Sequence, residues 1–120
     1  MNYRVLLYPL IAAMLIACGE GGQPTARINE SASQALQTQD PVLAEIYNRS
    51  CRSCHTVAAT GAPLTGDVAG WAPRMDKGMN TMVDNVVNGF GGMPPFGLCM
   101  DCDGDQFEAL IEFMAGSEGS

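Results

Sequence analysis

The sequence predicts a small all-α domain. Apolar residues recur at helical spacing in three segments of the chain, which begin near residues 41, 79 and 104. The alternation of apolar and polar residues that marks a half-buried strand is absent, and no internal repeat competes with the helical pattern. Because 120 residues leave room for one domain and not two, we expect a single helical core.

The first 17 residues have the pattern of an export signal. Arg4 precedes an apolar stretch from Val5 to Ala17, which is shorter than the roughly 20 residues that a permanent transmembrane helix needs. The stretch ends in Leu15-Ile16-Ala17-Cys18, which resembles a lipobox, the bacterial signal for diacylation of the cysteine. We therefore expect residues 1–17 to be a lipoprotein-type signal peptide and Cys18 to be lipidated. An uncleaved anchor or an ordinary signal peptide is the alternative.

This N-terminal segment also predicts a location. Two or more acyl chains on one residue hold a protein stably to a membrane, so the mature chain is expected in the periplasm and anchored through Cys18. Gly19, in place of Asp after the cysteine, is typical of lipoproteins sorted to the outer membrane. We expect the outer membrane rather than the inner one.

The segment 18–39 is predicted to be a flexible tether behind the lipidated cysteine. Residues 19–39 contain almost no large apolar side chains and show no clear period. A flexible chain of this length has an r.m.s. span of about 25 Å. A short helix around residues 32–37 is compatible with the composition, and the folded domain is expected to be 40–120.

The first helix of the folded domain is predicted to begin at Asp40-Pro41. Aspartate is a favoured N-cap, and proline is favoured at the first helical position. The apolar residues that follow share one face, and we expect the helix to run to about Ser50 or into the cysteine motif; these residues are Val42, Leu43, Ile46 and Tyr47.

Between the first and the last helix, the sequence predicts a loop, a short helical turn, a further helix and an irregular stretch. Residues 59–70 are rich in Gly, Pro, Thr and Asp and predict a loop, after which Pro73 is expected to open a short helical turn ending near Gly78. A helix is predicted from residue 79 or 80 to the Asn88-Gly89 stop. The Gly- and Pro-rich run 91–102 excludes a continuous helix.

The last helix is predicted to begin after Asp103, with Gln106 completing a capping box. Its apolar face has the spacing i, i+3, i+4 and i+7 and consists of Phe107, Leu110, Ile111 and Met114.

The motif Cys51-Arg52-Ser53-Cys54-His55 is the strongest chemical signal in the chain. On a helical turn both thiols and the imidazole share a face. This spacing is the signature of covalent haem c attachment, in which the two thiols add to the vinyl groups and the histidine ligates the iron. A cofactor is also expected because a domain of this size buries only about 60–65% of its unfolded surface.

A structural zinc site is the alternative for the cysteines. Cys51 and Cys54, together with Cys99 and Cys102, make two C-x-x-C pairs that could hold one tetrahedral ion. Helical flanks and export of the chain both disfavour this site, because exported thiols tend to be oxidised.

The sixth ligand of a haem iron cannot be a second histidine, because His55 is the only one in the chain. Met93 is the favoured candidate, since it lies between Gly-Gly and Pro-Pro on a stiff non-helical segment. Met100 and Met79 are reserves, whereas Met82 has the helical spacing of a core residue.

The charge of the chain disfavours nucleic acid as a partner. The sequence has six Lys and Arg against thirteen Asp and Glu, and loss of Arg4 with the signal leaves the mature chain at −8. The acidity alone identifies no other partner.

Several motifs in order resemble cytochrome c5, a class I monohaem family of bacterial electron carriers. After the cysteine motif come Gly61-Ala62-Pro63, Trp71-Ala72-Pro73-Arg74, Gly92-Met93-Pro94-Pro95 and Cys99-Met100-Asp101-Cys102. The resemblance spans roughly residues 42–115 and implies a small class I cytochrome c fold around one covalently bound haem.

The resemblance also implies roles for particular residues. His55 and Met93 would be the axial ligands, and Cys51 and Cys54 the attachment points. The carbonyl of Pro63 would bond the second nitrogen of His55. Trp71 and Arg74 would lie near a haem propionate, with core packing and a solvated charge as their alternatives. Cys99 and Cys102 would form a disulfide; a redox-active dithiol would need a βαβ setting that this sequence lacks.

With both axial positions filled by protein, we expect a single-electron carrier of relatively high potential and not an enzyme. Redox proteins would donate and accept electrons through brief docking at the exposed haem edge. Two alternatives remain open: a haem enzyme or gas sensor with a displaceable sixth ligand, and a fixed electron-entry subunit of a larger oxidoreductase.

Overall fold

The computed structural model describes residues 27–117, and this part of the chain is all-α as predicted. Among these residues the only β-type pairing is an isolated bridge between Phe90 and Met93. In chain order the helical elements are α1 (Glu30–Ala35), α2 (Pro41–Ile46), η1 (Tyr47–Cys51), α3 (Arg52–His55), η2 (Ala58–Thr60), α4 (Val68–Met75), α5 (Met79–Asn88), η3 (Pro95–Leu98) and α6 (Gly104–Ala115). The predicted signal peptide 1–17 and the predicted lipid site Cys18 lie outside the described residues.

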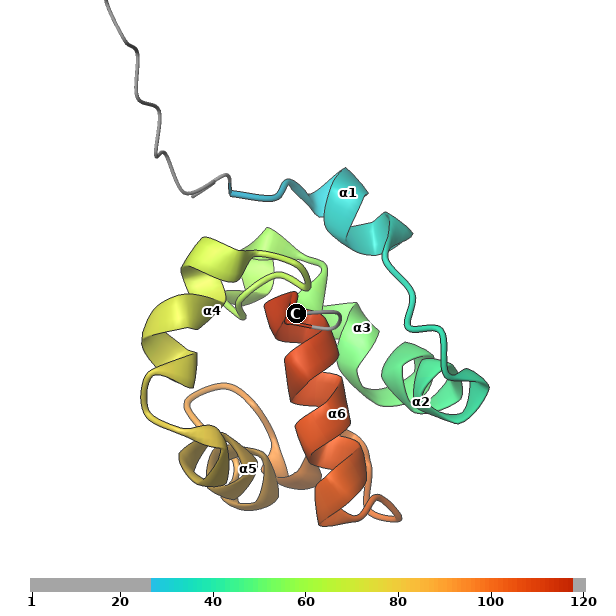
Figure 1. Cartoon of the computed structure of the whole chain (residues 1–120), viewed down its shortest axis with the longest axis vertical. Helices are drawn as coiled ribbons and strands as arrows, with labels where there is room; N and C mark the ends of the chain where they lie inside the picture. Colours follow the sequence, from blue (N-terminus) through green and yellow to red (C-terminus); the bar gives the residue numbers. More distant parts are fainter. Residues whose placement is uncertain (1–26, 118–120) are drawn as a thin grey trace, which may run out of the picture.

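Helix α6 lies at the centre of the fold. It contacts α2 on one side and both α4 and α5 on the other, so it connects the two halves of the domain (Figure 1). Its start has the predicted capping box: the Asp103 carboxylate accepts from the Gln106 N–H at 2.9 Å, and the Gln106 side chain accepts from the Asp103 N–H at 3.0 Å. The predicted apolar face is buried, with Leu110 and Ile111 each 2% exposed.

The first predicted helix continues into the cysteine motif. The Asp40 carboxylate caps α2 by accepting from the N–H groups of Val42 and Leu43, and Pro41 occupies the first turn. The path changes from α to a π turn at η1 and back to α at α3. A π turn adds a residue to the helical turn and shifts the side chains that follow around the axis. This shift occurs directly before Cys54 and His55.

The aromatic residue Tyr47 fixes this helical path to the core. It is fully buried, its ring meets that of Phe113 edge-on at 5.0 Å between centroids, and its hydroxyl lies 3.0 Å from the hydroxyl oxygen of Thr65. Buried tyrosines need such a partner for the phenol, and burial raises the pKa of Tyr47 above its ordinary value.

Helix α4 differs from the prediction. The sequence suggested that Pro73 opens a short turn, but α4 begins at Val68, where the side chain of Asp67 caps the helix by accepting from the N–H of Gly70. Pro73 therefore lies inside the helix. The loop after α3 correspondingly ends at Asp67 and contains the short turn η2. Burial of Trp71, which is 3% exposed, favours the longer helix despite the missing proline N–H.

Residues 27–39 also differ from the prediction of a flexible tether. They include α1, which is capped by Asn29, and they lie against the turn after α3 (Figure 1). Ser33 is fully buried and donates to the carbonyl of His55 at 3.4 Å, while Leu36 packs against the hydrophobic core. Leu36 fits because Gly66 lacks a side chain; a Cβ there would lie 2.5 Å from Leu36 Cδ1.

The segment between α5 and α6 is irregular, as its glycines and prolines predict. It begins at Gly89 and pairs Phe90 with Met93 through two backbone hydrogen bonds of 2.9 and 3.1 Å. It continues through η3, within which Phe96 and Gly97 have left-handed backbone angles. In the part of the chain that the structure describes, no helix is long and apolar enough to cross a membrane.

The burial of α6 gives a stability prediction. Leu110→Ala is expected to lower the free energy of unfolding by about 2–5 kcal/mol, because it removes a fully enclosed side chain and leaves a cavity. Leu98→Ala is the matched control; Leu98 is 66% exposed, so its loss should change stability by no more than about 0.5 kcal/mol. Denaturant unfolding of the two variants measures the difference. Equal losses of unfolding free energy in both variants would contradict the placement of Leu110 in the core.

Candidate haem-binding site

The residues of the cysteine motif lie on one continuous helical path. Cys51 ends η1, and Cys54 and His55 belong to α3. Both cysteines are free thiols in the structure, Cys51 half-buried and Cys54 exposed. Burial is the main cause that raises the pKa of the Cys51 thiol to about 11, so this group is neutral at physiological pH. A free thiol at this position remains available to form a thioether.

His55 is held in one orientation by the loop that follows it. Its Nδ1 lies 2.9 Å from the carbonyl oxygen of Pro63, which can only accept a hydrogen bond, so Nδ1 is the protonated nitrogen. Within residues 27–117 nothing bonds Nε2. Burial, reinforced by the charge of Arg74, holds the pKa of His55 below its ordinary value despite the opposing Pro63 bond. The neutral imidazole with a free Nε2 is the form that ligates a metal.

Trp71 and Arg74, both on α4, surround this histidine. The Trp71 ring is stacked on the His55 ring at 5.6 Å, and its Nε1 donates to the carbonyl of Leu64 at 2.9 Å. The indole N–H is therefore engaged by the protein itself, which favours the packing role for Trp71. Arg74 donates to the carbonyl of Gly70 and lines a pocket of about 350 Å³ together with Pro63.

Arg27 was missed by sequence reasoning and lines the same pocket. It forms an ion pair of 3.6 Å with Asp67, the buried cap of α4. The sequence placed Arg27 in the tether, and no local pattern distinguishes it from a solvated charge. Only the packing of residues 27–39 on the domain reveals its position.

Met93 occupies the stiff segment that the sequence singled out. Its backbone pairs with Phe90, and its half-buried side chain packs against the hydrophobic core, as does Cys51. The side chain also fills the space beside Gly97, where a Cβ would lie 3.1 Å from Met93 Cε. Met82 is buried in the core on α5, as expected, and Met100 is 73% exposed.

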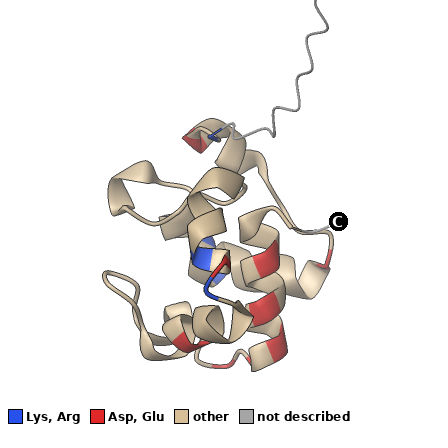
Figure 2. Ribbon diagram, turned by 60° about the vertical axis from the view of Figure 1, so that its left-hand side comes forward, with Lys and Arg blue, Asp and Glu red and all other residues tan. Residues whose placement is uncertain are grey.

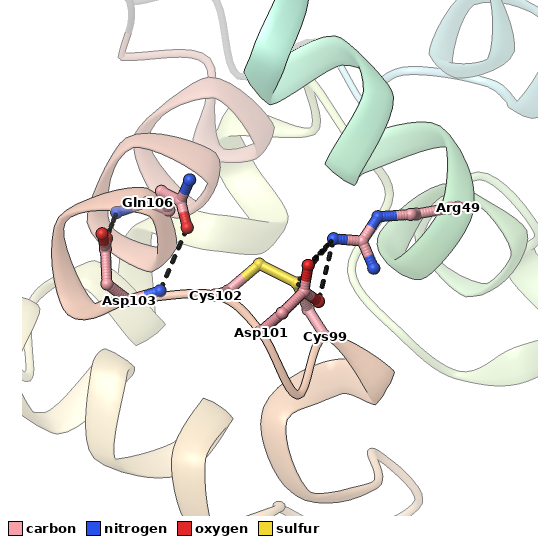
Figure 3. Close-up of polar contacts among 6 residues, drawn as sticks. All are labelled: Arg49, Cys99, Asp101, Cys102, Asp103 and Gln106. Carbon is pink, nitrogen blue, oxygen red and sulfur yellow. Dashed lines mark hydrogen bonds and ion pairs between the residues drawn. A yellow bond between two sulfur atoms is a disulfide. The ribbon is translucent and has the colours of Figure 1, made fainter.

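Cys99 and Cys102 are joined by a disulfide in the structure, with a Cα–Cα distance of 5.4 Å (Figure 3). Cys99 is 1% exposed and belongs to the core. A zinc site built from both C-x-x-C pairs needs four free thiols, and the disulfide engages two of them. The zinc alternative therefore does not fit this structure.

Gly89, the first residue of the irregular segment that contains Met93, yields a second prediction. Gly89 has φ 80° and ψ 154°, a conformation essentially restricted to glycine, and a Cβ there would lie 2.9 Å from the carbonyl oxygen of Met93. Gly89→Ala should therefore displace this segment and cost about 1–3 kcal/mol in unfolding free energy. Gly92→Ala, where a Cβ would meet nothing within 4 Å, is the control. Thermal unfolding of both variants tests the assignment, and equal midpoints would contradict it.

The residues present fit a haem c. Two free thiols three residues apart can form thioethers, and an oriented imidazole offers Nε2 to an iron. The thioether of Met93 and the guanidinium of Arg74 are of the chemical types that a second ligand and a propionate contact would need.

Comparison with known proteins places the chain in a family. Residues 39–114 match the family model described as cytochrome C oxidase, cbb3-type, subunit III. Cytochrome c5 of Azotobacter vinelandii is 34% identical over 74 residues, which cover 60% of this chain and 89% of that protein. Cytochrome c-555 of Chlorobaculum thiosulfatiphilum is 50% identical over 46 residues, covering 38% of this chain and 54% of the relative.

A solved structure agrees with these matches. A chain in the crystal structure titled as an electron transfer complex of nitrite reductase with cytochrome c superposes with a TM-score of 0.57 and 30% identity. The superposition covers 67% of this chain and 98% of that one. The resemblance to cytochrome c5 that the sequence motifs indicated is thereby confirmed. The chain belongs to the class I c-type cytochromes, a family of electron carriers, not enzymes, that bind covalently attached haem c.

Proposed function

We propose that this protein is an exported, lipid-anchored carrier of single electrons whose haem iron is ligated by His55 and Met93. The observation that supports this proposal best is the 2.9 Å contact between His55 Nδ1 and the Pro63 carbonyl, which leaves Nε2 for the iron. The free thiols of Cys51 and Cys54 on the same helical path supply the two covalent attachments.

The haem, when bound, supplies an iron that gains and loses one electron. The chain fixes this group and tunes it. Cys51 and Cys54 would anchor the haem, Pro63 keeps His55 in one tautomer and orientation, and Met93 would supply the second iron ligand. With both ligands supplied by the protein, no site would be left open for a substrate. A thioether ligand and a dry hydrophobic surround both favour the reduced iron, so the potential is expected to be relatively high.

Redox proteins are the proposed partners. The related crystal structure of a cytochrome c with nitrite reductase supports a brief complex of this kind. Acidic residues outnumber basic ones along the described ribbon (Figure 2), and α6 presents exposed carboxylates on successive turns at Asp105, Glu108 and Glu112. Such a surface steers association toward a partner with a basic docking face, and the association rate should fall as salt is added.

Periplasmic location and anchoring through Cys18 are also part of the proposal. Since residues 27–39 pack on the domain, only residues 19–26 separate this packed part from Cys18. Eight residues span at most about 29 Å whatever their conformation, so the domain would stay close to the membrane. The mass of the mature N-terminal peptide tests this point, since two or more acyl chains on Cys18 are expected.

Carbon monoxide distinguishes the carrier from a haem enzyme or gas sensor. Mixed with the reduced protein at neutral pH, it should bind slowly or not at all, because Met93 occupies the position that it needs. Prompt stoichiometric binding would refute the carrier. A pyridine haemochrome assay on the same preparation reports the thioether-linked haem.

A fixed electron-entry subunit is the second candidate function, and the matched family model, which is described as an oxidase subunit, favours it. Both candidate functions use the same haem site, and they differ in whether the protein stays bound to its redox partner. Co-purification of a stoichiometric partner after detergent extraction supports the fixed subunit, whereas a protein that emerges alone supports the carrier.

A further inference from the structure

The segment that follows Met93 adopts a left-handed turn. Phe96, Gly97 and Leu98 have φ values of 58°, 53° and 68° in succession. Glycine tolerates this region, but Phe96 and Leu98 do not favour it. Backbone of this kind persists only where the surrounding structure holds it. The turn therefore needs fixed points on both sides.

The two ends of this turn are held by different means. On the N-terminal side the backbone of Met93 pairs with Phe90. On the C-terminal side Cys99 is buried and bonded to Cys102. These contacts fix the turn to its own loop and to the core, but they do not tie it by polar contacts to the helix that bears the attachment cysteines.

Arg49 provides that tie. It lies in η1, two residues before Cys51, and its side chain reaches across to the disulfide loop (Figure 3). Its Nη2 atom lies 3.0 and 2.9 Å from the two carboxylate oxygens of Asp101 and 3.4 Å from Cys99 Sγ. Within residues 27–117 these are the hydrogen bonds that join η1 to residues 95–102.

The pair is formed by largely solvated groups. The Arg49 side chain is 40% exposed and that of Asp101 is 72% exposed. Exposed ion pairs add little to global stability. The hydrogen bond from Arg49 lowers the pKa of Asp101, so the carboxylate is charged at neutral pH and the contact is present there.

We propose that Arg49 and Asp101 are positioning residues for the sixth ligand. By joining the helix of Cys51 and His55 to the loop behind Met93, the pair keeps the left-handed turn closed and so keeps the thioether of Met93 on the iron. The inference rests on the proposed ligation by His55 and Met93. Its effect is expected on local opening of the loop, which breaks the pair while the rest of the domain stays folded.

Imidazole binding to the oxidised, haem-loaded protein measures this opening, because imidazole can reach the iron only after Met93 leaves. Arg49→Gln and Asp101→Asn should each raise the rate of imidazole binding by about two- to fivefold, the range that corresponds to an exposed ion pair. The double variant should be no faster than the single variants, because they remove the same contact. The free energy of unfolding from denaturant titration should fall by no more than about 1 kcal/mol, the upper value for an exposed ion pair.

Arg52→Gln is the matched control. Arg52 lies on the same helical path and bonds Asn48 and the carbonyl of Gln34 instead of the disulfide loop. The substitution removes the same charge, so an equal acceleration in this variant would overturn the proposal, as would unchanged rates in both Arg49→Gln and Asp101→Asn. If Arg49→Gln fails to load haem because of its closeness to Cys51, Asp101→Asn alone decides.

Failure of the proposed ligation has a different signature. If Met93 is not the ligand, the unmodified oxidised protein either lacks an iron–sulfur charge-transfer band or keeps this band when Met93 is replaced. In either case the ligation itself is refuted. If the band depends on Met93 and the rates do not depend on Arg49 or Asp101, only the positioning role is refuted.

Discussion

Met93→Ala is expected to abolish the iron–sulfur charge-transfer band of the oxidised protein and to open the iron to external ligands. The reduction potential should fall by a few tenths of a volt, since axial ligands set haem potentials over a range of about 0.8 V. The reduced variant should bind carbon monoxide promptly, which the unmodified protein should not do. Absorption spectroscopy and a redox titration measure these changes.

Met100→Ala is the control for this experiment. Met100 lies in the disulfide loop and is 73% exposed, so its removal should leave the band and the potential unchanged. If the band survives in Met93→Ala and is lost in Met100→Ala or Met79→Ala, the ligand has been assigned to the wrong methionine. The carrier function would then stand with a different sixth ligand.

Replacing both Cys51 and Cys54 with alanine is expected to have the largest effect of all. The variant should carry no covalent haem, and most of its helical structure should be lost, because a domain of this size depends on its cofactor for a sufficient core. Extraction with acidic acetone separates covalent from dissociable haem, and circular dichroism reports the helix content. Haem that stays with the chain after extraction would contradict the assigned attachment.

The other pair of cysteines provides the comparison. Cys99→Ala with Cys102→Ala removes the disulfide and leaves the attachment motif intact, so covalent haem should be retained. The loss in unfolding free energy should be about 2 kcal/mol, since the disulfide closes a very short loop. If this variant also lost its haem, the two C-x-x-C pairs would not have the separate roles proposed for them.

The sequence predicted the elements whose signals are local. Asp40 and Asp103 cap their helices as predicted because a cap needs only the next three residues. The same holds for the apolar face of α6, where helical spacing alone indicates which side chains are buried. The C-x-x-C-H motif is local as well, and it indicated the haem.

The errors concern contacts between distant parts of the chain. Residues 27–39 have a composition typical of a linker. They nevertheless pack on the domain, because Ser33 bonds the carbonyl of His55 and Leu36 fills the space beside Gly66, both more than twenty residues away. Helix α4 begins earlier than Pro73 suggested, because the longer helix buries the side chain of Trp71. The free energy of this burial comes from residues elsewhere in the chain, which the local sequence does not reveal.

The sequence by itself determined the fold class, the capped helices and the haem attachment motif, because each depends on spacing within a few residues. The contact of Pro63 with His55 was implied by the family resemblance, and the structure contains it. Only the tertiary structure decided that Arg49 reaches Asp101 across 52 positions and that residues 27–39 pack on the domain. These contacts arise where the packing of the core brings separate segments together. No pattern along the chain encodes that proximity, since the free energy of each contact is gained only in the folded state.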